Sequence, residues 1–445
     1  MSLATPPKVR KLQRTLYAKA KREPSFRFYS LYDKMHRPDV LAFAYARCKA
    51  NGGAPGVDGQ TFEDIESYGL DRWMGELAET LRTKRYRPQP VRRVYIPKPG
   101  QPKRQRPLGI PTITDRVAQT AAVLVLEPIF EADLQPEQYA YRPKRSALDA
   151  VRQVYALTDS GHREVVDADL SEYFETVPHA ELMRSVARRV SDGAVLRLIK
   201  MWLRMPVEEP DRRGRHRRQA RARKEKRGIP QGAPVSPVLA NLYMRRFVLG
   251  WKQLGHEQRL DAHIVNFADD LVICCRGTAD EAMAEMKRMM AQLRLTVNEQ
   301  KTCVCRLKHG SFDFLGYTFG RCYSRRTGVD YLGARPAKRQ VKRLHTALRE
   351  RTGRHRTNLP VQMVVAELNQ LLVGWANYFS LRLGPLSQTY AAVDAQARWR
   401  LRRWLNRKHK QSGNGGFRYP DQYLHGTLGL VELRCRRDGS SKASA

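Results

Sequence analysis

The stretch NFADDLVI, residues 266–273, places two adjacent aspartates inside a run of apolar, strand-forming residues. Burying a carboxylate in such a run costs free energy unless a partner compensates for it, and neighbouring carboxylates repel each other. The flanking segments HIVNF and LVICC favour strands, so the pattern predicts a β-hairpin with Asp269 and Asp270 at its tip. Because aspartate is a common turn residue, a turn with no chemical role is the alternative.

A third aspartate stands in a matching context one hundred residues before Asp269. Asp169 ends the strand-like segment VVDAD, residues 165–169. Carboxylates in a protein built to hold a polyanion would repel phosphate unless a divalent cation bridges them. Mg²⁺ suits this role because it binds a few carboxylates together with phosphate oxygens and keeps its remaining waters. The sequence therefore predicts a pair of metal ions, about 3.5–4 Å apart, held by these three aspartates.

The composition indicates a nucleic-acid partner. The 445 residues include 81 Lys and Arg against 44 Asp and Glu, for a net charge of +37. A charge that large opposes a compact state unless polyanions neutralise it, and it is typical of nucleic-acid-binding proteins. A basic surface that only confers solubility is the alternative. No stretch approaches the ~18 apolar residues of a membrane span, so we expect no membrane association.

The chain is longer than single hydrophobic cores usually grow, which predicts at least two lobes. Residues 1–30 are basic and contain three prolines, so we expect an arm that is mobile or ordered by a partner. Strands, helices and a β-hairpin follow, and residues 334–410 read as basic helices. This order predicts an α+β fold with a helical appendage.

Several motifs taken together resemble those of reverse transcriptases. In chain order they are DLSEYF (169–174), GIPQGAPVSPVLANLYM (228–244), FADDLVI (267–273), NEQKT (298–302) and FLGYTFG (314–320). Four further motifs narrow the resemblance to the group II intron-encoded class, which combines RNA-directed DNA synthesis with maturase activity. These are GAPGVDG (53–59), IPKPG…RPLGIPT (96–112), EQYAYRPKRSALDAV (137–151) and GTLGLVELR (426–434).

The resemblance implies a right-hand polymerase, with fingers and a palm that contains an antiparallel sheet, plus a helical thumb. Its expected parts are an N-terminal extension (1–75), reverse transcriptase fingers and palm (76–320), a helical thumb or maturase (X) domain (321–410) and a basic tail (411–445). Many relatives carry a further HNH endonuclease module with cysteine pairs. We expect a bacterial protein without that module, because no such pairs follow the thumb.

By resemblance, Asp169, Asp269 and Asp270 are the catalytic, metal-binding triad of the palm, and Leu170 binds metal through its backbone carbonyl. The expected ions are two Mg²⁺, with Mn²⁺ as the alternative. Phe267 stands where the family commonly has tyrosine. That change removes a hydroxyl but leaves both carboxylates, so we expect altered nucleotide selection rather than loss of chemistry.

The resemblance also implies a set of residues that contact the incoming nucleotide. Phe174 would exclude a ribose 2′-hydroxyl by steric clash, although spacing alone equally predicts a core aromatic. Lys98 and Arg106 would clamp the triphosphate, because an ammonium acts as a point charge and a guanidinium binds phosphate in a bidentate way. The full expected set is Lys98, Arg106, Arg142, Phe174, Gln231 and Lys301.

The function implied by the resemblance is an RNA-directed DNA polymerase that also binds its group II intron RNA to assist splicing and retromobility. Its partners would be that RNA or another RNA template, a DNA primer or target, and dNTPs, within a cytoplasmic, nucleoid-associated ribonucleoprotein. Two alternatives remain open. One is a domesticated relative that serves host defence or DNA repair, and the other is an RNA-binding maturase without polymerase activity. The oligomeric state is left open.

Overall fold

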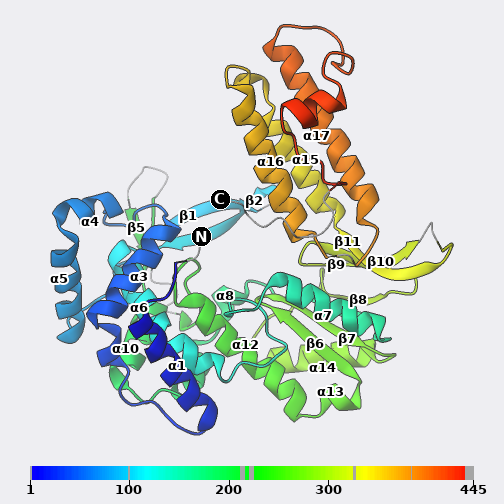
Figure 1. Cartoon of the computed structure of the whole chain (residues 1–445). Helices are drawn as coiled ribbons and strands as arrows, with labels where there is room; N and C mark the ends of the chain where they lie inside the picture. The colour runs from blue at the N-terminus through cyan, green and yellow to red at the C-terminus, as the bar shows by residue number, and fades with distance from the viewer. Residues whose placement is uncertain are drawn as a thin grey trace. The chain divides into compact units, whose positions relative to one another are not determined.

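The chain contains both helices and strands in a computed structural model that describes residues 3–98, 101–210, 216–219, 225–323, 327–381 and 383–435. The mixture agrees with the predicted α+β class. The chain forms two units, each interrupted in sequence (Figure 1). The first unit comprises Met1–Ser146, Val166–Ile273 and Thr278–Cys303, and the second comprises Ala147–Val165, Cys274–Gly277 and Val304–Ala445.

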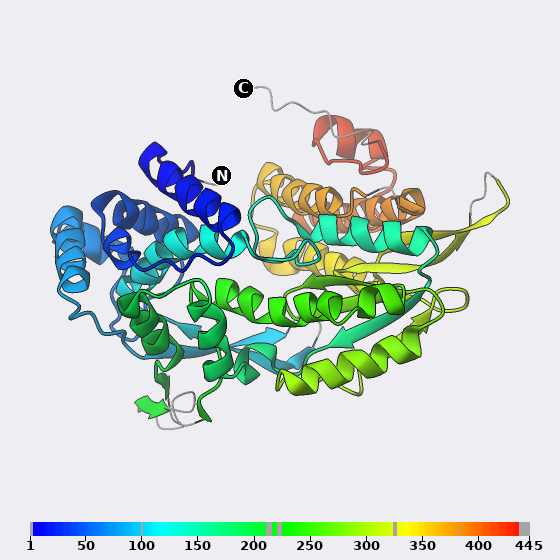
Figure 2. The ribbon, with the colours of Figure 1, turned by 90° about the horizontal axis from the view of Figure 1, so that it is seen from below.

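The amino-terminal helices of the first unit pack around α6 (Ile113–Glu131), which is buried along almost its whole length. Both α1 (Pro7–Arg22) and α3 (Pro38–Asn51) lie against it (Figures 1 and 2). The prediction of a mobile arm over residues 1–30 was therefore wrong. Helix α1 is amphipathic and buries Val9, Leu16 and Ala20, and its proline occupies the first turn, where the missing N–H costs nothing.

A buried arginine fastens the end of α1 to the rest of the first unit. Arg189 is fully buried and lies 3.1 Å from the carboxylate of Asp133. Its guanidinium also donates to the backbone carbonyls of Ala20, Glu23, Pro24 and Phe26. A buried charge needs such partners, so this contact orders the segment that follows α1.

Two four-stranded sheets frame the predicted active-site segments. In one, β1 (Val91–Lys98) pairs antiparallel with β2 (Gln101–Ile110), and the order is β2-β1-β4-β5 with β4 (Val207–Pro210) and β5 (His216–Gln219). In the other, β3 (Glu164–Asp169), β6 (Ala262–Phe267), β7 (Asp270–Cys275) and β8 (Cys303–Arg306) follow the order β6-β7-β3-β8. Most of the basic segment 212–227 lies outside the described residues.

The other helices of the first unit are short or cover the strands. They are α2 (Tyr32–Met35), α4 (Phe62–Tyr68), α5 (Leu70–Arg82), α8 (Tyr173–Thr176), α9 (His179–Ala187), α10 (Gly193–Leu203), α12 (Ser236–Gln253), α13 (His256–Arg259) and α14 (Ala279–Gln292). Helix α12 is buried through most of its residues, including Tyr243 and Trp251.

The second unit is mainly helical. Its three-stranded antiparallel sheet has the order β11-β10-β9, and the tight turn between β9 and β10 uses Leu315 and Gly316 at positive φ. Its strands and helices are β9 (Phe312–Phe314), β10 (Tyr317–Tyr323), β11 (Asp330–Pro336), α7 (Ala147–Asp159), α15 (Lys338–Arg351), α16 (Val361–Tyr378) and α17 (Leu386–Lys408), with a 3₁₀ turn at Arg354–Arg356 and a π-helical turn at Tyr423–Thr427.

The core of the second unit forms between α15, α16 and α17, which contain Leu348, Leu368 and Trp404 among their buried residues. Helix α15 begins at Lys338, inside the segment 334–410 that was predicted to be helical, and β10 and β11 occupy the chain before it, up to Pro336. Within the described residues, none of the helices combines the length and apolar character needed to cross a bilayer.

Candidate active site

The acidic pair lies at the tip of a hairpin, as predicted. Strand β6 ends at Phe267, and β7 begins at Asp270. Ala268 has φ +58°, a left-handed conformation that side chains other than glycine adopt at an energetic cost. The buried amide of Asn266 supports this turn, because its Nδ2 donates to the carbonyls of Ala268 (2.9 Å) and Asp270 (3.3 Å). The backbone thus presents both carboxylates at one tight turn.

The third aspartate ends β3 and is held by the NEQKT motif. Its backbone N–H donates to Thr302 Oγ1 (3.1 Å), and its carbonyl accepts from the N–H of Asn298 (2.8 Å). Lys301 Nζ lies 2.9 Å from Asp169 Oδ2. The predicted candidate Lys301 therefore contacts the predicted metal ligand directly. Asn298 and Thr302, which the sequence did not single out, fix the backbone of Asp169.

Leu170 continues the strand into an antiparallel bridge with Val297. The two bonds of this bridge come from its neighbours, since Ser171 N–H donates to Thr296 and Asn298 N–H donates to Asp169, both at 2.8 Å. Leu170 is thus a non-hydrogen-bonded position of this ladder, and its carbonyl takes no part in it. That geometry suits the predicted backbone ligand.

Strand β7, which begins at Asp270, and strand β3, which ends at Asp169, are neighbours in one sheet. The pKa of Tyr173, four residues after Asp169, is raised mainly by burial and also by the charges of Tyr243 and Asp269. The three aspartates do not, however, form a group with ligand atoms all within 4.8 Å in the described part of the chain. Like charges keep apart without a cation between them.

The oxygen donors at this site fit a hard divalent cation. Three carboxylates and one backbone carbonyl are the ligand types that Mg²⁺ prefers, and no cysteine or histidine stands among the four residues. The ammonium of Lys301 forms an ion pair with Asp169, so this carboxylate is accessible to a positive charge.

Arg106 and Tyr141 extend the site toward the β1–β2 hairpin. Burial and then the charge of Asp269 raise the pKa of Tyr141, the nearby Arg106 lowers it, and Asp270 raises it. Arg106 is exposed on β2, and Tyr141 is half exposed and has φ +55°. The structure therefore places the predicted triphosphate ligand Arg106 and the acidic tip near one tyrosine, which belongs to the motif EQYAYRPKRSALDAV and was not predicted to take part in the site.

Gln231 lies in a loop that packs on the end of β2. Its carbonyl accepts a hydrogen bond from the N–H of Gly109 (2.8 Å). A Cβ on Gly232 would lie 2.5 Å from the carbonyl oxygen of Gly109, and Gly232 has φ +101°. Glycine is required here because two backbones meet. This contact holds the half-buried Gln231 next to the strand that carries Arg106.

The other predicted nucleotide contacts differ in their surroundings. Phe174 is half buried, with its ring edge-to-face with that of Tyr173 at 5.6 Å, so it is not a fully buried core aromatic. Arg142 is a poor candidate, because its side chain is 7% exposed and its guanidinium binds Glu131 and two backbone carbonyls. The side chain of Lys98 lies outside the described residues.

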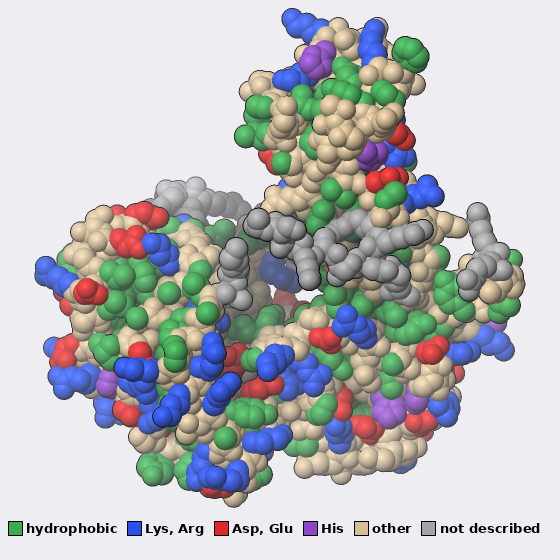
Figure 3. All heavy atoms as spheres, in the orientation of Figure 1, with side chains coloured by type: hydrophobic (Ala, Val, Ile, Leu, Met, Phe, Trp, Pro, Cys, Tyr) green, Lys and Arg blue, Asp and Glu red, His purple; other side chains and the backbone are tan. Residues whose placement is uncertain are grey.

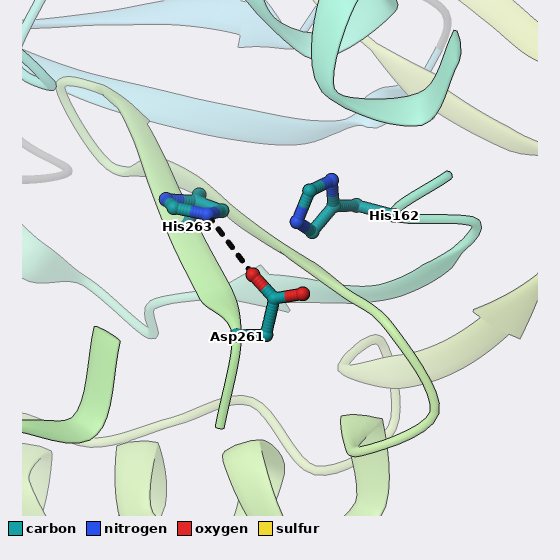
Figure 4. A group of neighbouring side chains, drawn as sticks. All are labelled: His162, Asp261 and His263. Atoms are coloured by element: carbon teal, nitrogen blue, oxygen red, sulfur yellow. Dashed lines mark ion pairs between the residues drawn. The ribbon is translucent and has the colours of Figure 1, made fainter. Parts of the chain in front are cut away.

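A second group of titratable side chains stands at the opposite end of β6 from the acidic tip. Figure 4 shows His263 beside Asp261, with Nε2 3.4 Å from Oδ1, and Nδ1 of the same ring lies 3.6 Å from Glu257. His162, also drawn there, belongs to the second unit. Pairing of partly exposed charges accounts for His263 and Asp261, so we assign them no cofactor.

Basic side chains gather on the surface of α1. Figure 3 shows Lys and Arg side chains over this helix, at the lower left of the view. The exposed basic residues of α1 are Lys8, Arg10, Lys11, Arg14, Lys21 and Arg22. Such a surface attracts phosphate, in keeping with the overall charge.

Comparison with known proteins matches two regions of the chain to described families. Residues 96–319 match the family described as reverse transcriptase (RNA-dependent DNA polymerase), and residues 341–419 match the group II intron, maturase-specific domain. The first region covers the acidic tip, Asp169 and the NEQKT motif.

Three relatives are similar over long regions. The protein YkfC of Escherichia coli is 33% identical over 354 residues, which cover 71% of this chain and 90% of YkfC. The group II intron-encoded protein LtrA of Lactococcus lactis is 31% identical over 228 residues, or 51% of this chain and 36% of LtrA. A putative COX1/OXI3 intron 1 protein of Saccharomyces cerevisiae is 23% identical over 390 residues, covering 76% of this chain and 44% of that protein.

The chain thus spans nearly all of YkfC but only about a third of LtrA. The order of motifs, the acidic tip beside the end of β3 and both family matches agree with one another. The chain therefore belongs to the reverse transcriptase (RNA-dependent DNA polymerase) family and joins that domain to a group II intron maturase-specific domain, as its motifs predicted.

Proposed function

We propose that this chain copies RNA into DNA at the site formed by Asp169, Asp269 and Asp270. The observation that supports the proposal is that β7, which begins at Asp270, and β3, which ends at Asp169, are neighbours in one sheet, while the charges of Asp269 and Arg106 both act on Tyr141. Its substrates are an RNA template, a DNA primer and dNTPs.

In the proposed reaction, different residues bind the metal ions and the nucleotide. The three carboxylates and the carbonyl of Leu170 hold two divalent ions, for which Mg²⁺ is the natural choice and Mn²⁺ the alternative. Bound ions would lower the pKa of a primer 3′-hydroxyl and neutralise charge on the departing pyrophosphate. Arg106, together with Lys98, binds the triphosphate, and Gln231 contacts the nucleotide from the loop anchored on Gly109.

Phe174 is the residue that we propose selects deoxyribose over ribose in the incoming nucleotide. It follows Asp169 by five residues, and its carbonyl accepts from Ile229 N–H at 2.6 Å, next to the loop of Gln231. A half-buried ring beside the nucleotide site can exclude a 2′-hydroxyl by occupying its volume. Arg142 is not part of the proposed site, because Glu131 and the carbonyls of Gln135 and Gln138 already engage its guanidinium.

The second unit supplies the maturase part of the proposal. Its helices α15, α16 and α17 lie almost wholly inside the match to the maturase-specific domain. We assign them as the thumb of a right-hand polymerase, with fingers and palm over residues 76–320, and propose that they bind group II intron RNA to assist splicing and mobility. The named relative LtrA is a group II intron-encoded protein, which supports this assignment.

The test replaces both tip carboxylates, as Asp269→Asn and Asp270→Asn, which keeps shape and removes charge. Primer extension on an RNA template with Mg²⁺ should fall at least a thousandfold, since the chemistry depends on bound ions. Binding of the template should persist, because it depends on the basic surface.

Asp261→Asn is the matched control. It removes one carboxylate at the opposite end of β6, where Asp261 pairs with His263, and should leave extension within about twofold of wild type. Undiminished synthesis by the tip variant, or an equal loss in the control, would refute the assignment of the site.

A further inference from the structure

Four arginines of the second unit gather on one face of α15 and α17, and none of them pairs with an acidic residue that the structure describes. Helices α15 and α17 are in contact, and Arg400, Arg403 and Arg407 follow one stripe of α17 at helical spacing. Burial lowers the pKa of Arg400, and so do the charges of Arg349, Arg403 and Arg407, in that order. These four residues, Arg349, Arg400, Arg403 and Arg407, are called the arginine face below.

Two other arginines of α17 have an acidic partner and serve as a comparison. Arg398 and Arg402 both pair with Asp421, and Arg402 also donates to the carbonyl of Tyr419. In contrast, no ion pair joins a member of the arginine face to a carboxylate in the described part of the chain. The Nε atom of Arg400 is buried and has no acceptor there either.

An exposed tryptophan orients two members of the face. The guanidinium carbons of Arg400 and Arg403 each lie 4.8 Å from the centre of the Trp399 ring, and Trp399 is 40% exposed. Cation–π contacts of this kind hold a guanidinium in place without using its N–H donors. Arg403 is exposed to solvent, whereas Arg400 is half buried and its Nε atom is buried.

Helix dipoles explain only part of this arrangement. Arg349 and Arg407 stand in the last turns of α15 and α17, where a cation is favourable. Arg400 and Arg403 stand further inside α17, where that effect has faded. Like charges held together without a counter-ion destabilise the free protein, so their placement calls for an external anion.

We propose that the arginine face is a binding site for the phosphate backbone of structured RNA. The stripe from Arg400 to Arg407 spans about 10 Å along the helix, enough for two or more consecutive phosphates. Guanidinium groups match phosphate in a bidentate way, which favours this ligand over a neutral one. RNA is the expected occupant because the four residues fall within the match to the maturase-specific domain, so the inference rests on the proposed function.

The experiment compares two double variants of the full chain that remove equal charge from the same helix. Arg400→Gln with Arg403→Gln changes the arginine face, and Arg398→Gln with Arg402→Gln changes the paired arginines. The probe is a labelled RNA hairpin with no primer, and its affinity is measured over a range of salt concentrations. The slope of log affinity against log salt should become shallower by about 1.5–2 in the first variant and by less than about 0.5 in the second.

Two further readouts separate binding from structure. The melting temperature of the arginine-face variant should equal or exceed that of wild type, because a repulsion is relieved, whereas loss of the Asp421 pairs should lower it. The far-ultraviolet circular dichroism spectra of both double variants should match that of wild type, which shows that the helices are intact. Arg403→Gln alone, at an exposed side chain, serves if the double variant does not fold.

An unchanged slope, or an equal change in both double variants, would overturn the proposal. So would a loss confined to an RNA–DNA template–primer duplex with no loss for the hairpin, since the face would then serve the copied strand. These outcomes leave the polymerase assignment untouched, because the aspartate variants decide that separately.

Discussion

Replacing Lys301 with glutamine should make the site bind divalent metal more tightly. Lys301 Nζ lies 2.9 Å from Asp169 Oδ2, so an ion that binds this carboxylate must first displace the ammonium. The two side chains are 53% and 37% exposed, and a pair this open is worth about 0.5–1 kcal/mol. Removing the competitor should therefore lower the concentration for half-saturation by about two- to fivefold.

The assay is Mn²⁺ binding to the protein without nucleic acid, followed by the loss of the free-ion signal in electron paramagnetic resonance. It reads metal affinity directly and does not depend on turnover. Lys287→Gln is the control. Lys287 pairs with Glu299, which belongs to the same NEQKT motif as Lys301, and its replacement changes the net charge by the same amount. If Lys301→Gln binds Mn²⁺ no better than wild type, or if both variants gain equally, the competition argument fails.

Two further predictions concern the framework that positions the site. Gly232→Ala should reduce primer extension more than tenfold, because its Cβ would lie 2.5 Å from the Gly109 carbonyl oxygen at φ +101°. Gly75→Ala in α5, where a Cβ meets open space, should leave extension unchanged and raise the melting temperature slightly. Arg189→Met should destabilise the first unit by about 3–5 kcal/mol in urea unfolding, since it leaves the carbonyls after α1 without their donor and removes the buried arginine that pairs with Asp133. Arg188→Met, at an exposed partner of Asp133, should cost under about 1 kcal/mol, and equal losses in the two variants would contradict the burial argument.

The acidic tip was predictable because it depends on local pattern. Alternation and β-branched residues around Asp269 and Asp270 specify a hairpin, and a hairpin exposes its turn. The contacts that fix Asp169 were not predictable in the same way, since Thr302 and Lys301 lie more than 130 residues away along the chain. The motif NEQKT identified Lys301 as a candidate but did not indicate that Asn298 and Thr302 bind the backbone of Asp169.

Two expectations failed for a common reason. The first 30 residues read as a loose arm because charge hid the helical spacing of Val9, Leu16 and Ala20. Arg142 was predicted to bind phosphate because the sequence does not reveal that Glu131 pairs with its guanidinium in the folded chain. In both cases tertiary contacts use residues that look solvated in the sequence.

Charge is unbalanced in opposite senses at the two candidate sites. At the candidate active site, Lys301 pairs with Asp169, and the carboxylates would repel phosphate until a divalent cation binds. On the arginine face, none of the ion pairs between described residues joins a guanidinium group to a carboxylate, and the proposed ligand is an anion. Because one site requires divalent cations and the other requires phosphate, the two steps should respond to different ions. RNA binding should weaken with monovalent salt and hold without Mg²⁺, whereas DNA synthesis should stop without Mg²⁺ while the RNA remains bound.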